Sequence, residues 1–176
     1  MNWLARASSD DFAAQSDLLP GVVRIGIDPG ISGAVAIIDD DRVIDVFDMP
    51  VLPKASGKGN QVNAAELARQ LRPYKLEFDP HVYVELVGAM PGQGVTSMFN
   101  FGKSAGIVEG VLAALGMSWT YVAPQSWKVR AGLKKREKDY ARTRVCQCFP
   151  SASGFVARKR DSGRADAILI ARFGEP

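Results

Sequence analysis

Along the chain, short hydrophobic runs typical of strands alternate with segments in which hydrophobic residues recur at helical spacing. Short runs of β-branched residues bounded by turn residues predict strands, and the first three are close enough in sequence to pair as an antiparallel meander. The expected strands are Val22–Asp28, Gly33–Ile38, Val43–Phe47, Val82–Leu86 and Trp119–Val122. The segment Met49–Gln61 is rich in Pro, Gly, Lys and Ser and therefore predicts a flexible loop.

Helical periodicity fills the remaining chain. Asn63 is expected to cap a first helix, with Glu66 completing a capping box. The other expected helices are Ser97–Leu115 with Gly116 as its stop, a short one between Pro124 and Gly132, Glu137–Phe149, and Ser162–Phe173. This order of elements predicts an α/β fold, with one mixed sheet flanked by helices.

Length and rare residues narrow the function. The 176 residues suit one domain, which we expect over residues 21–176 after an N-terminal arm of residues 1–20. A single histidine, His81, excludes Ser-His-Asp triads and histidine-rich zinc sites. The uncharged stretch 110–127 is broken by Gly116 and Pro124, so we expect no membrane span. Two cysteines and no recognisable signal peptide predict a reduced, cytoplasmic protein.

Charge is distributed unevenly along the chain. The net charge is only +3, yet eleven of the 22 Lys and Arg residues lie between residues 124 and 160 with two of the 19 acids. A basic segment on an acidic body favours a polyanionic partner such as nucleic acid, and a solvated helix face is the alternative interpretation.

Three acids stand in hydrophobic surroundings far apart in sequence. Asp28 ends the first predicted strand, Glu85 lies in an apolar strand, and Asp166 lies in an otherwise small and apolar helix, with Asp161 near that helix's start. If they converge, their oxygens suit a hard cation such as Mg²⁺ or Mn²⁺. Separately, Asp28 could cap a turn, Glu85 could pair with Arg24 or Lys103, and Asp166 could face solvent.

These positions carry a family resemblance. The segments Gly26–Gly30 and Ser32–Ala36, Tyr83–Glu85 with its glycine-rich loop, and Arg164–Ala167 resemble the RuvC family of Holliday-junction resolvases, in particular its phage and prophage members. The resemblance covers about Val22 to Phe173 and implies a ribonuclease H-like fold, with a five-stranded sheet of three antiparallel strands followed by parallel strands.

The resemblance also implies the site. It assigns Asp28, Glu85 and Asp166 as catalytic metal ligands for two Mg²⁺ ions, which Mn²⁺ can replace. The family usually has a fourth acid or His where this chain has Gly163. Asp161, one turn further away, is the candidate substitute, and the alternative is that water fills the position.

The expected DNA contacts fall into two groups. Lys128 and Lys138 resemble the family's DNA-contacting lysines, and other basic residues crowd the same region: Lys134, Lys135, Arg136 and Arg142. A hydrophobic wedge at a branch point is expected from Met90, Phe99 or Phe101, although the phenylalanines could instead anchor a helix in the core.

The sequence therefore predicts a homodimeric, metal-dependent endonuclease that resolves four-way DNA junctions by paired nicks. The resemblance implies attack by water that leaves a 5′-phosphate and a 3′-hydroxyl. Small residues such as Gly102, Gly106 and Gly110 on the long helix would allow either a dimer contact or packing within the monomer. The alternatives are a nuclease of the same fold acting on flaps, forks or RNA–DNA hybrids, and a non-catalytic DNA-binding module.

Overall fold

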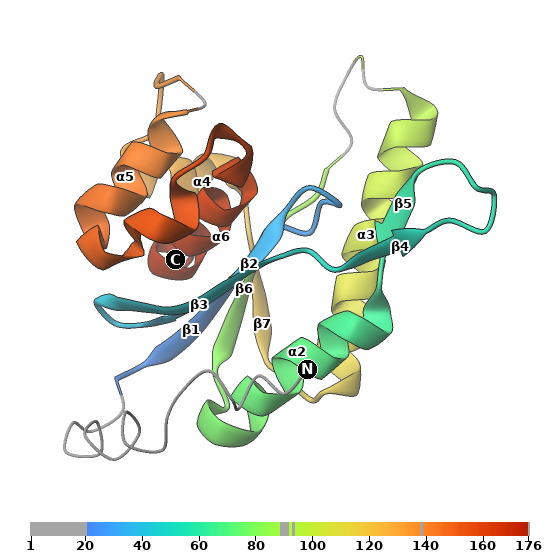
Figure 1. Ribbon diagram of the computed structural model, residues 1–176, viewed down its shortest axis with the longest axis horizontal. Helices are drawn as coiled ribbons and strands as arrows, with labels where there is room; N and C mark the ends of the chain where they lie inside the picture. Colours follow the sequence, from blue (N-terminus) through green and yellow to red (C-terminus); the bar gives the residue numbers. More distant parts are fainter. Residues whose placement is uncertain (1–20, 89–91, 93, 138, 176) are drawn as a thin grey trace.

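A mixed five-stranded sheet forms the centre of the protein, as the sequence predicts. The computed structural model describes residues 21–88, 92, 94–137 and 139–175, so the predicted N-terminal arm lies outside the described residues. The strand order is β3-β2-β1-β6-β7 (Figure 1). The strands are β1 Val23–Ile27, β2 Ala34–Asp39, β3 Arg42–Asp48, β6 His81–Glu85 and β7 Trp119–Val122. The first three are antiparallel, whereas β6 and β7 run parallel to β1.

Helices cover both faces of this sheet (Figure 1). One face carries α4 Pro124–Arg130, α5 Tyr140–Cys148 and α6 Ser162–Phe173, and the other carries α2 Ala64–Phe78 and α3 Val95–Ala114. Two 3₁₀ helices that the sequence did not predict, η2 Pro150–Val156 and η3 Lys159–Asp161, lead into α6. Within the described part of the chain, no helix is both long and apolar enough to cross a membrane.

The alternation of side chains in β2 divides the core into two layers. Ala34 and Ala36 are fully buried in the cluster beneath α6, whereas Val35 and Ile37 are fully buried in the cluster beneath α2 and α3. A strand covered on both faces reads as a continuous hydrophobic run, which is why this strand was recognisable from sequence.

Glycines allow α6 to approach the sheet closely. A Cβ atom on Gly26 would lie 2.1 Å from the Ala167 carbonyl oxygen and 2.4 Å from the Ala171 nitrogen. A Cβ on Gly163 would lie 2.5 Å from the Ser32 carbonyl oxygen. The start of α6 therefore rests directly on the turn between β1 and β2, and this contact fixes the position of the acids that the two elements carry.

The predicted flexible loop over Met49–Gln61 is wrong in part. Within it, β4 Val51–Pro53 pairs antiparallel with β5 Asn60–Val62, and this hairpin lies beside α3 (Figure 1). Strands of three residues are too short to show a period of two, and contacts from a distant helix stabilise them. Local sequence therefore carries little signal for this hairpin.

The predicted cap of α2 is half confirmed. The Asn63 side chain accepts a hydrogen bond from the Glu66 nitrogen at 3.2 Å. The Glu66 carboxylate does not complete the expected box, because it accepts hydrogen bonds from Arg69 and Gln70. The Asn63 nitrogen donates instead to the Pro50 carbonyl at 2.8 Å, which ties the start of α2 to the beginning of the hairpin.

Candidate active site

Two acids emerge at neighbouring strand ends. Asp28 directly follows β1, and Glu85 is the last residue of β6. The two strands are parallel and their last register pair is Ile27 with Val84, so each acid is the next residue along its strand. Parallel strands present their carboxyl ends at one edge of a sheet, which is where ligands usually bind.

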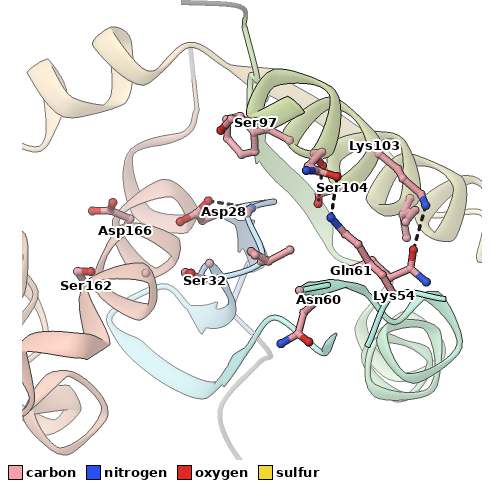
Figure 2. A pocket seen from close by; sticks show the side chains of 18 residues that line it. Asp28, Ser32, Lys54, Asn60, Gln61, Ser97, Lys103, Ser104, Ser162 and Asp166 are labelled. Atoms are coloured by element: carbon pink, nitrogen blue, oxygen red, sulfur yellow. Dashed lines mark hydrogen bonds between the residues drawn. The ribbon is translucent and has the colours of Figure 1, made fainter. Parts of the chain in front are cut away.

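A cavity of about 520 Å³ lies beside this edge and is lined by Asp28 and Asp166 (Figure 2). Its walls come from the β1–β2 turn, the β4–β5 hairpin, α3 and the start of α6. Glu85 is not part of the lining, although it lies near enough to Asp28 for the two charges to interact. Two of the three predicted ligands thus share one cavity, with the third adjacent.

Asp28 has a structural role as well as a place in the cavity. Its Oδ1 accepts a hydrogen bond from the Gly30 nitrogen at 3.2 Å, and its own nitrogen donates to the Ala34 carbonyl at 3.0 Å. A Cβ on Gly33 would lie 2.2 Å from the Asp28 carbonyl oxygen, so this tight turn requires glycine. The predicted turn cap and the predicted ligand position are therefore compatible.

Glu85 is a partly buried carboxylate with an indole partner. Its pKa is raised, mainly because burial disfavours the charged carboxylate and also because the Asp28 charge lies nearby. A 3.0 Å hydrogen bond from Trp127 Nε1 and the charge of Lys128 lower the pKa and only partly offset this rise. Neither predicted alternative partner pairs with it. Arg24 contacts Asp40 and Lys103 contacts the Gln61 amide oxygen. The ionised form of Glu85 is consequently costly until a cation approaches.

Asp161, the candidate fourth ligand, is engaged elsewhere. It is 3% exposed and accepts hydrogen bonds from the Arg158 backbone nitrogen at 2.8 Å and from the Arg158 guanidinium at 2.9 to 3.2 Å. These bonds lower the pKa of Asp161. It does not line the cavity. We therefore leave Asp161 out of the proposed ligand set.

Position 163 also has no room for a fourth ligand. A side chain there would meet the Ser32 carbonyl and the Gly33 backbone, because the start of α6 rests on the β1–β2 turn. Among the described residues, α6 therefore offers the cavity one acid, Asp166.

Asp28 and Asp166 offer oxygen donors of the kind that a hard cation prefers. Within the described residues, no three acidic, His or Cys side chains lie close enough to form a complete metal cage. Mg²⁺ commonly takes one or two protein carboxylates together with waters and substrate phosphates, and it prefers oxygen donors. A cation would also offset the repulsion between Asp28 and Glu85, which favours binding at this edge.

The predicted DNA-contacting basic residues have different surroundings. Lys134, Lys135 and Arg136 are exposed in the turn between α4 and α5. Lys128 on α4 is partly buried, with its Nζ 5.0 Å from the Trp127 ring centroid. Lys138 lies outside the described residues.

Arg142 is occupied within the fold. Its guanidinium makes hydrogen bonds of 2.9 and 2.6 Å to Asp139, and it donates to the Val156 and Ala157 carbonyls at 3.2 Å each. This arrangement holds α5 against η2. A DNA contact by Arg142 stays a prediction that the geometry does not favour.

The candidates for the hydrophobic wedge differ in their exposure to solvent. Phe99, near the start of α3, is 71% exposed, so it does not anchor that helix in the core. Phe101 is partly buried and lines the cavity. Met90 lies outside the described residues.

Several residues at the site were not anticipated from the sequence. Trp127 binds Glu85 although α4 and β6 are distant in sequence. The hairpin contributes Lys54, Asn60 and Gln61 to the cavity. The one local signal was composition, since Met49–Gln61 contains two lysines and no acid.

Comparisons with known proteins agree with this architecture. No protein-family model matches the chain. Over 92 residues, or 52% of the chain, it is 31% identical to the chloroplastic Holliday junction resolvase MOC1 of Chlamydomonas reinhardtii, and the match spans only 10% of that protein.

Two solved structures resemble most of the chain. Thermus thermophilus RuvC in complex with a Holliday junction substrate aligns with a TM-score of 0.63 at 18% identity, over 86% of this chain and 92% of that chain. A second structure of Thermus thermophilus RuvC gives a TM-score of 0.53 at 16% identity, over 86% and 96%. The fold predicted from the resemblance is thereby confirmed.

Proposed function

We propose that this protein is a metal-dependent endonuclease that resolves four-way DNA junctions by paired nicks. The observation that carries the proposal is the placement of Asp28 and Asp166 in one cavity, with Glu85 at the adjoining strand end. The RuvC-type fold supports the class of enzyme. The partial identity to a chloroplastic Holliday junction resolvase supports the choice of substrate.

Each residue of the site has a defined part in this reaction. Asp28, Glu85 and Asp166 would hold the divalent cations, Mg²⁺ or Mn²⁺, together with waters and substrate phosphates. When bound, such ions stabilise the charge that develops on the scissile phosphate and promote attack by water. Trp127 orients Glu85 through its 3.0 Å hydrogen bond. The predicted products carry a 5′-phosphate and a 3′-hydroxyl.

The exposed basic residues between α4 and α5 supply the phosphate contacts. Lys134, Lys135 and Arg136 lie on this turn, and Lys128 brings its charge close to Glu85. Contacts of this kind position a DNA backbone without reading its sequence.

We further propose that the active form is a homodimer joined through α3. Cβ atoms added to Gly102, Gly106 or Gly110 would meet nothing within 4 Å among the described residues, so this face of α3 is open to a second copy. Val95 and Phe99 on the same helix are 79% and 71% exposed. A two-fold dimer presents two active sites, as paired nicks on a four-way junction require.

Incubation with Mg²⁺ and matched four-way junction, flap, fork, RNA–DNA hybrid and linear duplex tests the proposed function. We expect nicks in the junction alone, at symmetric positions in two opposing strands. Cleavage confined to flaps or forks would favour a different structure-selective nuclease. Junction binding without cleavage would favour a non-catalytic module, and either result would contradict the proposal.

A further inference from the structure

The cavity has a second, positively charged end formed by residues outside the basic segment 124–160. Lys54 from the hairpin and Lys103 from α3 both line it (Figure 2). Figure 2 shows them on the opposite side of the cavity from Asp28 and Asp166. One cavity thus joins a pair of carboxylates to a pair of ammonium groups.

Both lysines are held by neutral partners. Lys54 Nζ donates to the Asn100 amide oxygen at 2.7 Å, and Lys103 Nζ donates to the Gln61 amide oxygen at 2.9 Å. Each contact crosses between the hairpin and α3, so the two ammonium groups have defined positions. An amide oxygen orients an ammonium group without neutralising it, and each ammonium has three N–H donors. Charge and donors therefore remain for an anion.

Two arginines near the start of α6 differ from these lysines, because each is paired with a carboxylate. Arg164 is paired with Asp48 through hydrogen bonds of 2.6 and 2.8 Å, and Arg158 is paired with Asp161. For Lys54 and Lys103, by contrast, the partners seen among the described residues are amides. The hairpin segment Met49–Gln61 itself contains no acid that could supply a counter-charge.

The size of the cavity suits a nucleotide strand rather than a lone ion. Its volume of about 520 Å³ lies within the usual range of ligand pockets, roughly 300–1,000 Å³. In a strand bound with one phosphate at the carboxylates and their cations, the next phosphates follow at short intervals along the backbone.

We infer that Lys54 and Lys103, oriented by Asn100 and Gln61, form a second phosphate-binding subsite for the strand that is cut. This inference rests on the proposed function. The subsite binds a phosphodiester adjacent to the scissile one, and the hairpin thereby aligns the strand over the carboxylates. The competing explanation is that the two contacts merely fasten the hairpin to α3.

Fluorescence anisotropy of junction binding tests the subsite. Ca²⁺ replaces Mg²⁺ in this measurement to prevent cleavage. Lys54→Gln and Lys103→Gln remove the charge but keep a hydrogen-bonding side chain. Each should weaken binding about tenfold. Each should also reduce the slope of log affinity against log salt by about 0.7 to 0.9, the contribution of one phosphate contact.

Lys58→Gln is the matched control, because it removes the same charge from the same hairpin at a residue that does not line the cavity. An equal loss in Lys58→Gln would mean that general hairpin charge is responsible and would overturn the subsite. Lys54→Arg and Lys103→Arg keep the charge and should keep the wild-type slope. A lower melting temperature with an unchanged slope in the Gln variants would identify the fastening role instead.

The two proposals fail in different ways. If the wild type cuts junctions in Mg²⁺ while both Gln variants bind with wild-type affinity and slope, the subsite is wrong and the proposed function stands. If the wild type cuts none of the substrates in Mg²⁺, the proposed function is wrong, and the subsite, which rests on it, falls with it.

Discussion

Asp161 and Asp166 show that the surroundings of an acid decide whether its carboxylate is available to a cation. Both acids lie at the start of one helix, and both are candidate ligands in the sequence, Asp166 in an apolar stretch and Asp161 directly after the basic run 158–160. In the structure Arg158 neutralises Asp161, while Asp166 lines the cavity. Sequence predicts which acids lie in costly surroundings. It cannot predict which of them acquires a counter-charge, because that depends on how a preceding 3₁₀ helix turns its arginine.

Asp161→Ala and Asp166→Asn should therefore have opposite effects. Asp161→Ala removes the bonds to Arg158 and should lower the free energy of unfolding by about 2 kcal/mol, with cleavage largely retained below the melting temperature. Asp166→Asn should lower cleavage roughly 10³-fold or more with little change in stability. Thermal melts and junction cleavage rates, measured on both variants, test this. A large loss of cleavage in folded Asp161→Ala would restore Asp161 as a ligand.

Glu85 gives a prediction about pH and stability. Burial and the Asp28 charge raise its pKa above the ordinary value of 4.5, so the folded protein binds this proton more tightly than the unfolded chain does. The ionised carboxylate therefore destabilises the fold above the folded-state pKa, and the penalty fades as pH falls through that pKa.

Metal-free Glu85→Gln should consequently melt at a higher temperature than the wild type at about pH 8, with the difference shrinking toward about pH 4.5. Circular dichroism melts in EDTA across this range measure the effect. A variant that melts lower than the wild type at the higher pH would mean that the Trp127 bond outweighs the burial of the charge.

At the scale of elements, the sequence predicts the strands and helices whose hydrophobic residues recur at regular spacing. It misses the elements that are stabilised by contacts with distant parts of the chain. β7 and α6 match the expected ranges Trp119–Val122 and Ser162–Phe173, and the alternating core of β2 explains its detection. The β4–β5 hairpin was missed because its strands are short and α3 supports it. The sequence also does not show which basic side chains of residues 124–160 are available to a partner. Arg142 is bonded within the fold, whereas Lys134 and Lys135 are exposed.

The close approach of α6 to β1 yields a contrast between two glycines. Gly26→Ala places a Cβ 2.1 Å from the Ala167 carbonyl oxygen, so we expect a loss of about 3 kcal/mol in the free energy of unfolding. Gly154→Ala, in η2 with nothing within 4 Å, should change that free energy by no more than about 0.5 kcal/mol. Urea denaturation measures both. Equal stabilities for Gly26→Ala and the wild type would show that α6 does not rest on β1 as described.

At the scale of the whole molecule, the small net charge of +3 conceals a basic segment, residues 124–160, and an acidic remainder of the chain. Three of the acids in that remainder are the proposed metal ligands, so bound cations would make the active protein more basic than its formal charge. Sequence indicated this division and the class of chemistry. It could not indicate that one cavity combines both signs, because the hairpin lysines and α3 meet only in the fold.

The proposed dimer predicts a specific loss of assembly. Gly106→Arg places a long charged side chain on the open face of α3, where it has room in the monomer but none against a second copy. We expect sedimentation equilibrium to change from a dimer to a monomer, with the melting curve still cooperative and paired nicks lost. A wild type that sediments as a monomer on its own would contradict the dimer through α3.

Strand-specific mapping of nicks on a four-way junction in Mg²⁺ tests the central claim most directly, with the wild type beside Asp166→Asn. The account predicts paired nicks at symmetric positions in two opposing strands for the wild type, each with a 5′-phosphate. It predicts no nicks for Asp166→Asn, which should still bind the junction with wild-type affinity. An intact junction with the wild type, or wild-type cleavage by Asp166→Asn, would contradict it.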